Sequence, residues 1–488
     1  MIHKFKSLFF SADGTKRVVF KNFLWLSVSQ VGSRVVRAAI TIYAARALGA
    51  AQYGVFSYAL GLAGFFVFFK NIGVDFIMTR DIAKDSELRE KIFSTGFWIE
   101  ICLLILTALL LLFVAPVFSK IGAAIILLPA VAIMLIADDL RDFFVAFFRG
   151  MEKMEWEAIT VTLANVSVTV FGFTALAYSR TPLSLAIAYA SASLLATVIT
   201  ASILFWRYGV RVITNFTRSL VVPILSAAWP IAVTGLPGIF LYNVDLVMLG
   251  WWWPSSTVGI YAATQKLVGI LSILPQLIAT STFPVFSRFA KQRDDTKTRQ
   301  LMESTTRIIF AFAIPLIVGG IVLGAPLLAR VFGAEYAAGE YAFVILLLSI
   351  LFTYPVLIIS NFIFAHNAQR SVIRCAFVAA GTNVVLNALL VPHLGMVGTS
   401  FATLVSFGLY VGCMYRSARS LVHFPFFPNL TKIFVSAMGL AVIATLLRIM
   451  GVGVLTNILI SAVFYLGILF LMREEALIEA IDLFKNKP

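Results

Sequence analysis

The sequence predicts an all-α membrane protein of about 14 transmembrane helices, arranged as two six-helix bundles followed by two more helices. The first observation is composition: 60% of the 488 residues are hydrophobic and only 12% are charged, whereas soluble domains are about half apolar and a quarter charged. The second is that apolar runs of about 18 residues or more recur from end to end. The third is an internal repeat, described below.

Fourteen apolar runs define the expected helices, and the loops between them are too short for a separate soluble domain. The expected spans are residues 22–47, 54–76, 92–117, 121–147, 156–179, 183–206, 220–249, 258–284, 304–325, 339–365, 372–391, 395–416, 431–449 and 452–472. We expect a cytoplasmic N-terminal segment at 1–21, six-helix bundles at 22–206 and 220–416 joined by a cytoplasmic linker at 207–219, additional helices within 431–472 and a cytoplasmic tail at 473–488.

Basic residues predict the orientation of the spans. With a cytoplasmic N-terminus, the cytoplasmic segments hold 28 of the 38 lysines and arginines. The opposite side holds only Arg46, Lys120, Arg180, Arg330 and Arg448. This bias follows the positive-inside rule and places both termini in the cytoplasm. It also explains the net charge of +15 without a nucleic acid partner.

The sequence contains no signature of an enzyme or a metal protein. There is no P-loop, no HExxH, no GxSxG and no Cys/His cluster, and no outer loop is large enough for a membrane-bound glycan polymerase. We therefore expect no catalytic residue, no metal and no cofactor. Cys102, Cys375 and Cys413 lie far apart in apolar runs, so we expect small core residues rather than a disulfide.

The first twelve spans look like two copies of one six-helix unit. The segment "ALGAAQYGVFSYALGLAGFF" at 47–66 resembles "MLGWWWPSSTVGIYAATQKLVGIL" at 248–271, and this alignment pairs Gly54 with Gly259. Because six is an even number, both copies share one orientation in the membrane. Transporters are commonly built in this way, with the substrate site between the two halves.

A polar stripe crosses the first span. Ser27, Gln30, Arg34, Arg37 and Thr41 follow spacings of three and four residues and therefore share one narrow helix face. Two central arginines cost roughly 5–7 kcal/mol on an insertion scale unless they are compensated. Either they are paired structural charges, or they line a functional cavity, and we favour the cavity because ionisable groups within the membrane usually serve function.

Other polar groups lie at comparable depth in the second copy. One face of the seventh span carries Thr234, Gly238, Tyr242 and Asp245. One face of the eighth span carries Tyr261 and Gln265, and Lys266 points about 100° away from Gln265. The eleventh span carries Asn383 and Asn387, one turn apart. Asp245 is expected either to bind a coupling cation or to pair with an arginine. The asparagines, with Asn165 as their counterpart in the fifth span, either bind substrate or only bridge helices.

The fourth span carries a cluster that can neutralise itself. Asp138, Arg141 and Asp142 lie at i, i+3 and i+4, so we favour a structural role for them.

The remaining polar groups predict a cavity that is more cationic than anionic. Such a cavity suits an anionic substrate, since arginine binds phosphate in a fork. Tyr242 and Tyr261 are candidates for stacking on sugars.

Two segments resemble a known family. "RALGAAQYGVFSYA" with "NIGVDFIMTRDIAK", and "YNVDLVMLG" with "VGIYAATQKL", are similar to the polysaccharide transporter family, the Wzx-type lipid-linked oligosaccharide (O-antigen) flippases. The wider superfamily also contains multidrug exporters and lipid II flippases. The resemblance implies a V-shaped fold, like that of the multidrug exporters, around a cationic lumen in the bacterial inner membrane.

The resemblance also implies the reaction: an undecaprenyl-diphosphate-linked glycan moves from the cytoplasmic to the outer leaflet by alternating access. The implied partners are this lipid-linked glycan, the bilayer, a coupling ion (H⁺ or Na⁺) or the membrane potential, and other polysaccharide assembly proteins. Arg34 and Arg37 match the charged first helix of these flippases, and Asp245 matches the acidic position of their seventh. Gln30, Tyr242, Tyr261, Gln265, Lys266 and Asn383 complete the expected binding residues. A lipid II flippase and a multidrug exporter of the same fold remain the alternatives.

Overall fold

The computed structural model describes residues 14–70, 72–85, 87–210 and 215–474, with side chains from residue 32 onward except those of residues 70 and 274. Within these ranges the chain is helical and contains no strand. It folds into two compact units. Unit 1 comprises residues 1–48 and 55–239, and unit 2 comprises residues 49–54 and 240–488.

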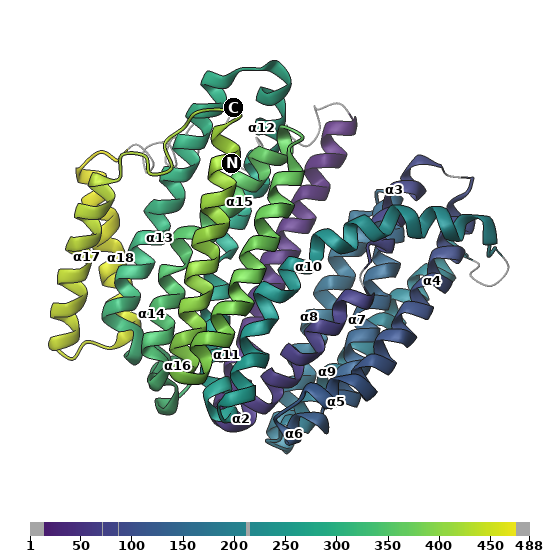
Figure 1. Ribbon diagram of the computed structural model, residues 1–488, viewed down its shortest axis with the longest axis horizontal. Coiled ribbons are helices and arrows are strands. Elements are labelled where there is room, and N and C mark those ends of the chain that lie inside the picture. The colour runs from purple at the N-terminus through teal and green to yellow at the C-terminus, as the bar shows by residue number, and fades with distance from the viewer. Residues whose placement is uncertain (1–13, 71, 86, 211–214, 475–488) are drawn as a thin grey trace, which may run out of the picture. The chain divides into compact units, whose positions relative to one another are not determined.

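Unit 1 is a helical bundle with an aromatic core. Its helices are the two parts of α2 (Gly14–Lys70) outside residues 49–54, then α3 (Val74–Lys84), α4 (Arg89–Leu109), α5 (Ala115–Phe118), α6 (Gly122–Ile125), α7 (Leu128–Gly150), α8 (Met154–Tyr178), α9 (Pro182–Ser202) and the first part of α10 (Val221–Trp252). Helices α7 and α8 both pack against α9, as Figure 1 shows. The ring of Phe93 contacts those of Phe143 and Phe147 in the core, and all three are buried. This packing fixes α7, which carries charged residues on another face.

Unit 2 contains the rest of the chain. Its helices are the end of α10, then α11 (Ser255–Leu271), α12 (Ile273–Gln292), α13 (Asp295–Val331), α14 (Glu340–Leu348), α15 (Ile350–Ala365), α16 (Gln369–Arg419), α17 (Thr431–Ile449) and α18 (Val454–Leu471). Helices α17 and α18 form a hairpin that packs against α13 (Figure 1). Gly395, at φ 53°, breaks α16 into two arms. The left-handed conformation there favours glycine.

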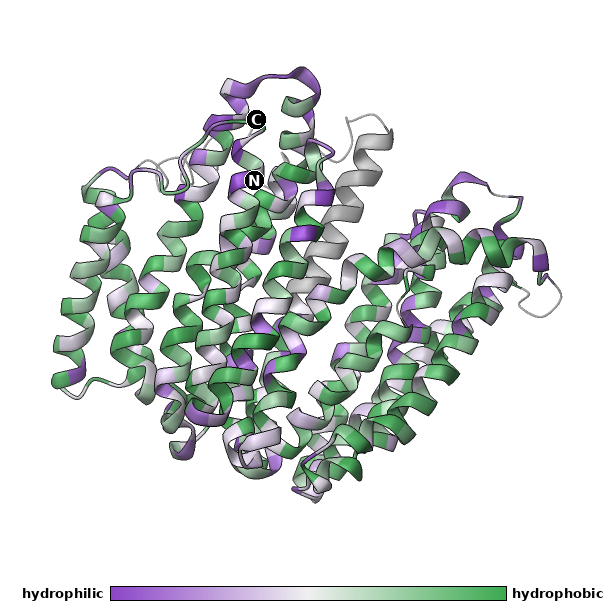
Figure 2. Cartoon of the chain, in the orientation of Figure 1, coloured by the Kyte–Doolittle hydropathy of each residue, from purple (hydrophilic) through white to green (hydrophobic). Residues whose placement is uncertain are grey.

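The helices have the composition of membrane spans. Figure 2 shows hydrophobic residues along most of their length and hydrophilic residues gathered toward many of their ends. By length and composition, ten described helices can cross a membrane, or eleven when α11 and α12 count as one bent span. The chain is therefore a multi-pass membrane protein, but the predicted count of 14 is not confirmed. The difference arises because α2 and α16 each join two predicted spans across a break, at Gly49 and at Gly395, and because α7 carries five charged residues from Asp138 onward.

The prediction that the cysteines form no disulfide is wrong. Cys375 and Cys413 are bonded, with their Cα atoms 5.6 Å apart. The two residues lie 38 positions apart, one on each arm of α16, and the break at Gly395 brings the arms together. The third cysteine, Cys102 of α4, is free and exposed. Hydropathy patterns could not show this pairing because it depends on the direction in which the chain turns.

Gly54 and Gly259, which the predicted repeat aligns with each other, meet inside unit 2. A Cβ atom added to Gly54 would lie 1.7 Å from the carbonyl oxygen of Ser255, and one added to Gly259 would lie 1.9 Å from that of Ala50. The segment 49–54 therefore contacts α11 backbone to backbone. Glu335 supports the same segment, since its Oε1 accepts a hydrogen bond of 2.9 Å from the Ala50 amide.

Candidate functional site

A charged pocket of about 440 Å³ lies within unit 1. We call it the arginine pocket; Ser33, Arg34, Arg37, Asp75, Arg141, Asp142, Arg149, Glu157, Ala158, Val161 and Asn165 line it. These residues come from the first part of α2 and from α3, α7 and α8. Its volume lies within the range of small-molecule sites, about 300–1,000 Å³.

Two of the four arginines in the pocket are held by carboxylates. Arg149 donates two hydrogen bonds to Glu157, of 2.9 and 2.7 Å, in a bidentate pair that joins α7 to α8. Arg141 donates to both Asp138 and Asp142 at 2.8 Å, which confirms the predicted self-neutralising cluster. Since these two arginines pair with three carboxylates, they shape the wall of the pocket and contribute no free positive charge.

The other two arginines have uncommitted charge. Arg37 donates a long hydrogen bond, 3.4 Å, to the neutral amide of Asn165. Arg34 forms no ion pair with any residue whose side chain the structure describes, and both arginine side chains are exposed to the pocket. Ser33 beside them is only 6% exposed, and its hydroxyl has no hydrogen-bond partner among the described groups. The pocket therefore presents two cations to whatever enters it.

A second polar cluster is buried in unit 2 around Asp245. Asp245 is 1% exposed, and its carboxylate accepts hydrogen bonds from Tyr261 (2.8 Å), Asn387 (2.9 Å) and Thr403 (2.7 Å). These three donors are neutral, and no salt bridge to Asp245 is found among the described side chains. The residues come from α10, α11 and both arms of α16.

Two amide groups next to Asp245 are incompletely satisfied. The Asn387 Nδ2 donates to Asn383 Oδ1 at 3.2 Å, while Asn383 Nδ2 and Asn387 Oδ1 have no partner among the described groups. Both asparagines are fully buried. Oxygen atoms of a carboxylate, amides and a hydroxyl are the ligands that hard cations prefer. The set is therefore chemically able to hold a small cation or a proton.

The other predicted site residues of unit 2 lie in varied surroundings. Tyr242 is 65% exposed, whereas Tyr261 is fully buried and directs its hydroxyl to Asp245 rather than offering a free ring face. Gln265 is half-buried and Lys266 is exposed. The side chain of Gln30, predicted for the first span, lies outside the residues whose side chains the structure describes.

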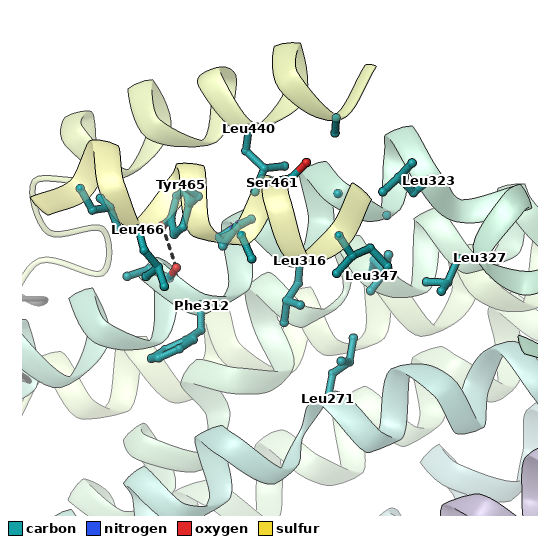
Figure 3. Close-up of a pocket in the computed structure, with 18 of the residues that line it drawn as sticks. Leu271, Phe312, Leu316, Leu323, Leu327, Leu347, Leu440, Ser461, Tyr465 and Leu466 are labelled. Atoms are coloured by element: carbon teal, nitrogen blue, oxygen red, sulfur yellow. Dashed lines mark hydrogen bonds between the residues drawn. The ribbon is translucent and has the colours of Figure 1, made fainter. Parts of the chain in front are cut away.

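Unit 2 also contains an apolar cavity of about 550 Å³. Figure 3 shows leucines pointing into it from α11, α13, α14, α17 and α18. Its polar members are Ser461, bonded to Asn457, and Tyr465, whose hydroxyl donates to the Ala311 carbonyl at 2.7 Å. Since those hydroxyls are satisfied within the protein, the cavity can offer only apolar contacts to a ligand.

Several of these residues were not predicted as site residues from the sequence. Asp75, Arg149 and Glu157 lie near helix ends, where charged residues are common, and Thr403 carries no sequence signal beyond being polar in an apolar run. Asn387 was predicted as a neighbour of Asn383. These residues lie together only because of how the helices pack, and the sequence pattern carries no information on that packing.

Comparison with known families supports the resemblance found in the sequence. The model of the family described as "Polysaccharide biosynthesis protein" matches residues 19–290, more than half of the chain, and the MatE model matches residues 230–389. A protein of Haloferax volcanii named "Probable flippase AglR" is 27% identical over 253 residues, which cover 50% of this chain and 53% of that protein. The resemblance to polysaccharide transporters is thereby confirmed.

Two other proteins extend the comparison. A protein of Escherichia coli (strain K12) named as an O-antigen transporter is 26% identical over 287 residues, which cover 55% of this chain and 64% of that protein. Both matches thus span less than two thirds of the relatives' length. A solved structure of the lipid II flippase MurJ in an inward closed conformation has a TM-score of 0.73 at 18% identity, over 93% of this chain and 99% of that chain. This likeness confirms the predicted all-α transporter fold.

Proposed function

Since this chain belongs to the polysaccharide biosynthesis protein family, we propose that it is a flippase that moves a lipid-linked glycan across the membrane. Its substrate is an undecaprenyl-diphosphate-linked oligosaccharide, carried from the cytoplasmic to the outer leaflet of a bacterial inner membrane by alternating access. It acts as a transporter and not as an enzyme, with both termini in the cytoplasm. The names of the flippase and O-antigen transporter relatives support this proposal.

One observation carries the proposal: Arg34 and Arg37 line a pocket in which the other arginines are already neutralised. A diphosphate cannot cross hydrocarbon unaided, and two uncommitted guanidinium groups are suitable ligands for it. Two paired arginines would instead have indicated structural charges. The exposed arginine pair therefore favours an anionic substrate over the cationic drugs that an exporter of this fold would carry.

The test is charge replacement in a strain that lacks this gene. R34Q and R37Q should abolish surface polysaccharide and accumulate the lipid-linked intermediate, whereas R34K and R37K should restore part of the export. R299Q is a matched control, because Arg299 pairs with Glu303 on α13 and does not line the pocket. Membrane expression of each variant is measured in parallel. Full export by both glutamine variants would refute the cationic site.

The Asp245 cluster supports a role in coupling. We propose that its carboxylate binds H⁺ or Na⁺ and links the gradient of that ion to transport, since a buried carboxylate among neutral donors is costly without a cation. The alternative expected from the sequence, pairing with an arginine, gains no support from the hydrogen bonds around Asp245. Collapsing the proton gradient, the sodium gradient and the membrane potential one at a time should identify the coupling force. Transport that is unaffected by all three would exclude coupling through Asp245.

The apolar cavity of unit 2 supports a place for the lipid. We propose that the prenyl chain lies beside α17 and α18, where leucines line the cavity. A444W should obstruct the cavity and reduce transport, because Ala444 is fully buried on its wall. V442W on the exposed face of the same helix serves as the control. Equal transport by both variants would place the lipid chain elsewhere.

Two rivals share the fold and require separate tests. A lipid II flippase should be essential, so a viable deletion in a strain without the downstream sugar pathway would exclude it. The similarity to the MurJ structure is consistent with a lipid II flippase, but it shows only that the fold is shared. A multidrug exporter should change drug susceptibility when deleted, and unchanged susceptibility would exclude that alternative.

A further inference from the structure

Asp75 is the unexplained member of the arginine pocket. It lies in the first turn of α3 and is half-buried. Its carboxylate accepts no hydrogen bond from any described group, although it is close enough to Arg149 to interact electrostatically. Arg149 gives its own hydrogen bonds to Glu157. A carboxylate on the wall of a pocket that faces an anion repels that anion unless the ligand brings a hydrogen-bond donor to it.

The pocket thus contains two kinds of recognition group within one unit. Arg34 and Arg37, whose side chains are exposed to the pocket, can bind an anion. Asp75 can accept hydrogen bonds only, since an ionised carboxylate has no donor. A ligand that satisfies both must present an anionic group and donor groups within the reach of one cavity of about 440 Å³. A diphosphate followed directly by a sugar has this chemistry, because sugar hydroxyls are donors next to the phosphates.

We infer that Asp75 determines specificity for the sugar attached to the diphosphate, by accepting hydrogen bonds from its hydroxyls while Arg34 and Arg37 hold the phosphates. This inference rests on the proposed function. Asp75 would thereby allow the protein to distinguish a diphosphate that carries a sugar from one that does not. Removing the charge of Asp75 should affect these two ligands differently, because the first donates a hydrogen bond to the carboxylate whereas the second is only repelled by it.

The test uses the purified full chain in lipid nanodiscs and two soluble probes of equal charge, α-glucosyl diphosphate and methyl diphosphate. D75N should weaken binding of the glucosyl probe about tenfold, the effect of one hydrogen bond to a charged group. The same variant should leave binding of the methyl probe unchanged or tighter. D81N is the matched control on α3, because Asp81 pairs with the exposed Arg80 and does not line the pocket.

The possible outcomes separate this inference from the proposed function. If R34Q and R37Q abolish binding of both probes while D75N affects the two probes equally, the arginine site stands and the role of Asp75 is refuted. Equal binding of both probes by the unaltered protein also refutes that role. Binding of neither probe by the unaltered protein overturns both the arginine site and the inference. Retained binding of the methyl probe shows that D75N is folded; if D75N is unstable, D75S is measured with the same expected pattern.

Discussion

Replacing Gly54 with alanine should destabilise unit 2, although a glycine-to-alanine change within a helix ordinarily stabilises it. The added Cβ would lie 1.7 Å from the Ser255 carbonyl oxygen and 2.8 Å from the Gly259 amide nitrogen, whereas ordinary contact begins at 3.4 Å. Both neighbours are backbone atoms, so no side chain can rotate away. The helices must separate until the nearest distance has doubled.

Such overpacking costs about 1–3 kcal/mol and occasionally more, and we expect the upper end here. At roughly 2 °C per kcal/mol for a large chain, the apparent Tm of G54A should fall by about 6 °C. Thermal unfolding of purified protein, followed by size-exclusion chromatography, measures this shift. G412A is the control, because nothing lies within 4 Å of a Cβ at Gly412. Equal melting temperatures for G54A and G412A would refute the close backbone contact.

Three further predictions concern other interactions. E335A should lower the apparent Tm, because it leaves the buried Ala50 amide without its acceptor at a cost of about 1–3 kcal/mol; an unchanged Tm would show that water replaces the carboxylate. A double-mutant cycle of Arg149→Gln and Glu157→Gln should give a coupling energy of about 0.5–3 kcal/mol in thermal unfolding, and additive effects would argue against the bidentate pair. Under non-reducing denaturing conditions, a maleimide reagent should label one thiol, that of Cys102, and should label three after reduction of the α16 disulfide; three labelled thiols without reduction would contradict the disulfide.

The sequence predicts interactions between residues close together on one helix, but it does not predict interactions between residues far apart in the chain. Asp138, Arg141 and Asp142 lie within one turn, so their spacing alone predicts the ion pairs that the structure contains. Asp245 bonds to residues 142 and 158 positions away, Asn387 and Thr403, and no periodicity determines such a pairing.

The charged pocket shows the same limit. A polar stripe identifies Arg34 and Arg37, because an arginine in an apolar run is conspicuous. Asp75 and Glu157 stand near helix ends, where charged residues are common, and only packing of α3 and α8 beside the first part of α2 gives them a place on the same pocket. Cys375 and Cys413 were likewise misjudged, since their bond requires the turn at Gly395.

The membership of residues 49–54 in unit 2 bears on whether the protein can be divided. The internal repeat suggests that each half could be produced separately and then recombined, as in split-protein complementation. A fragment that begins at residue 240 would lack the short segment whose amide Glu335 holds and whose glycine fits against α11. The two halves of the predicted repeat therefore do not correspond to two separable products. Each later change in residues 49–54 is constrained by α11, a helix encoded some 200 codons downstream.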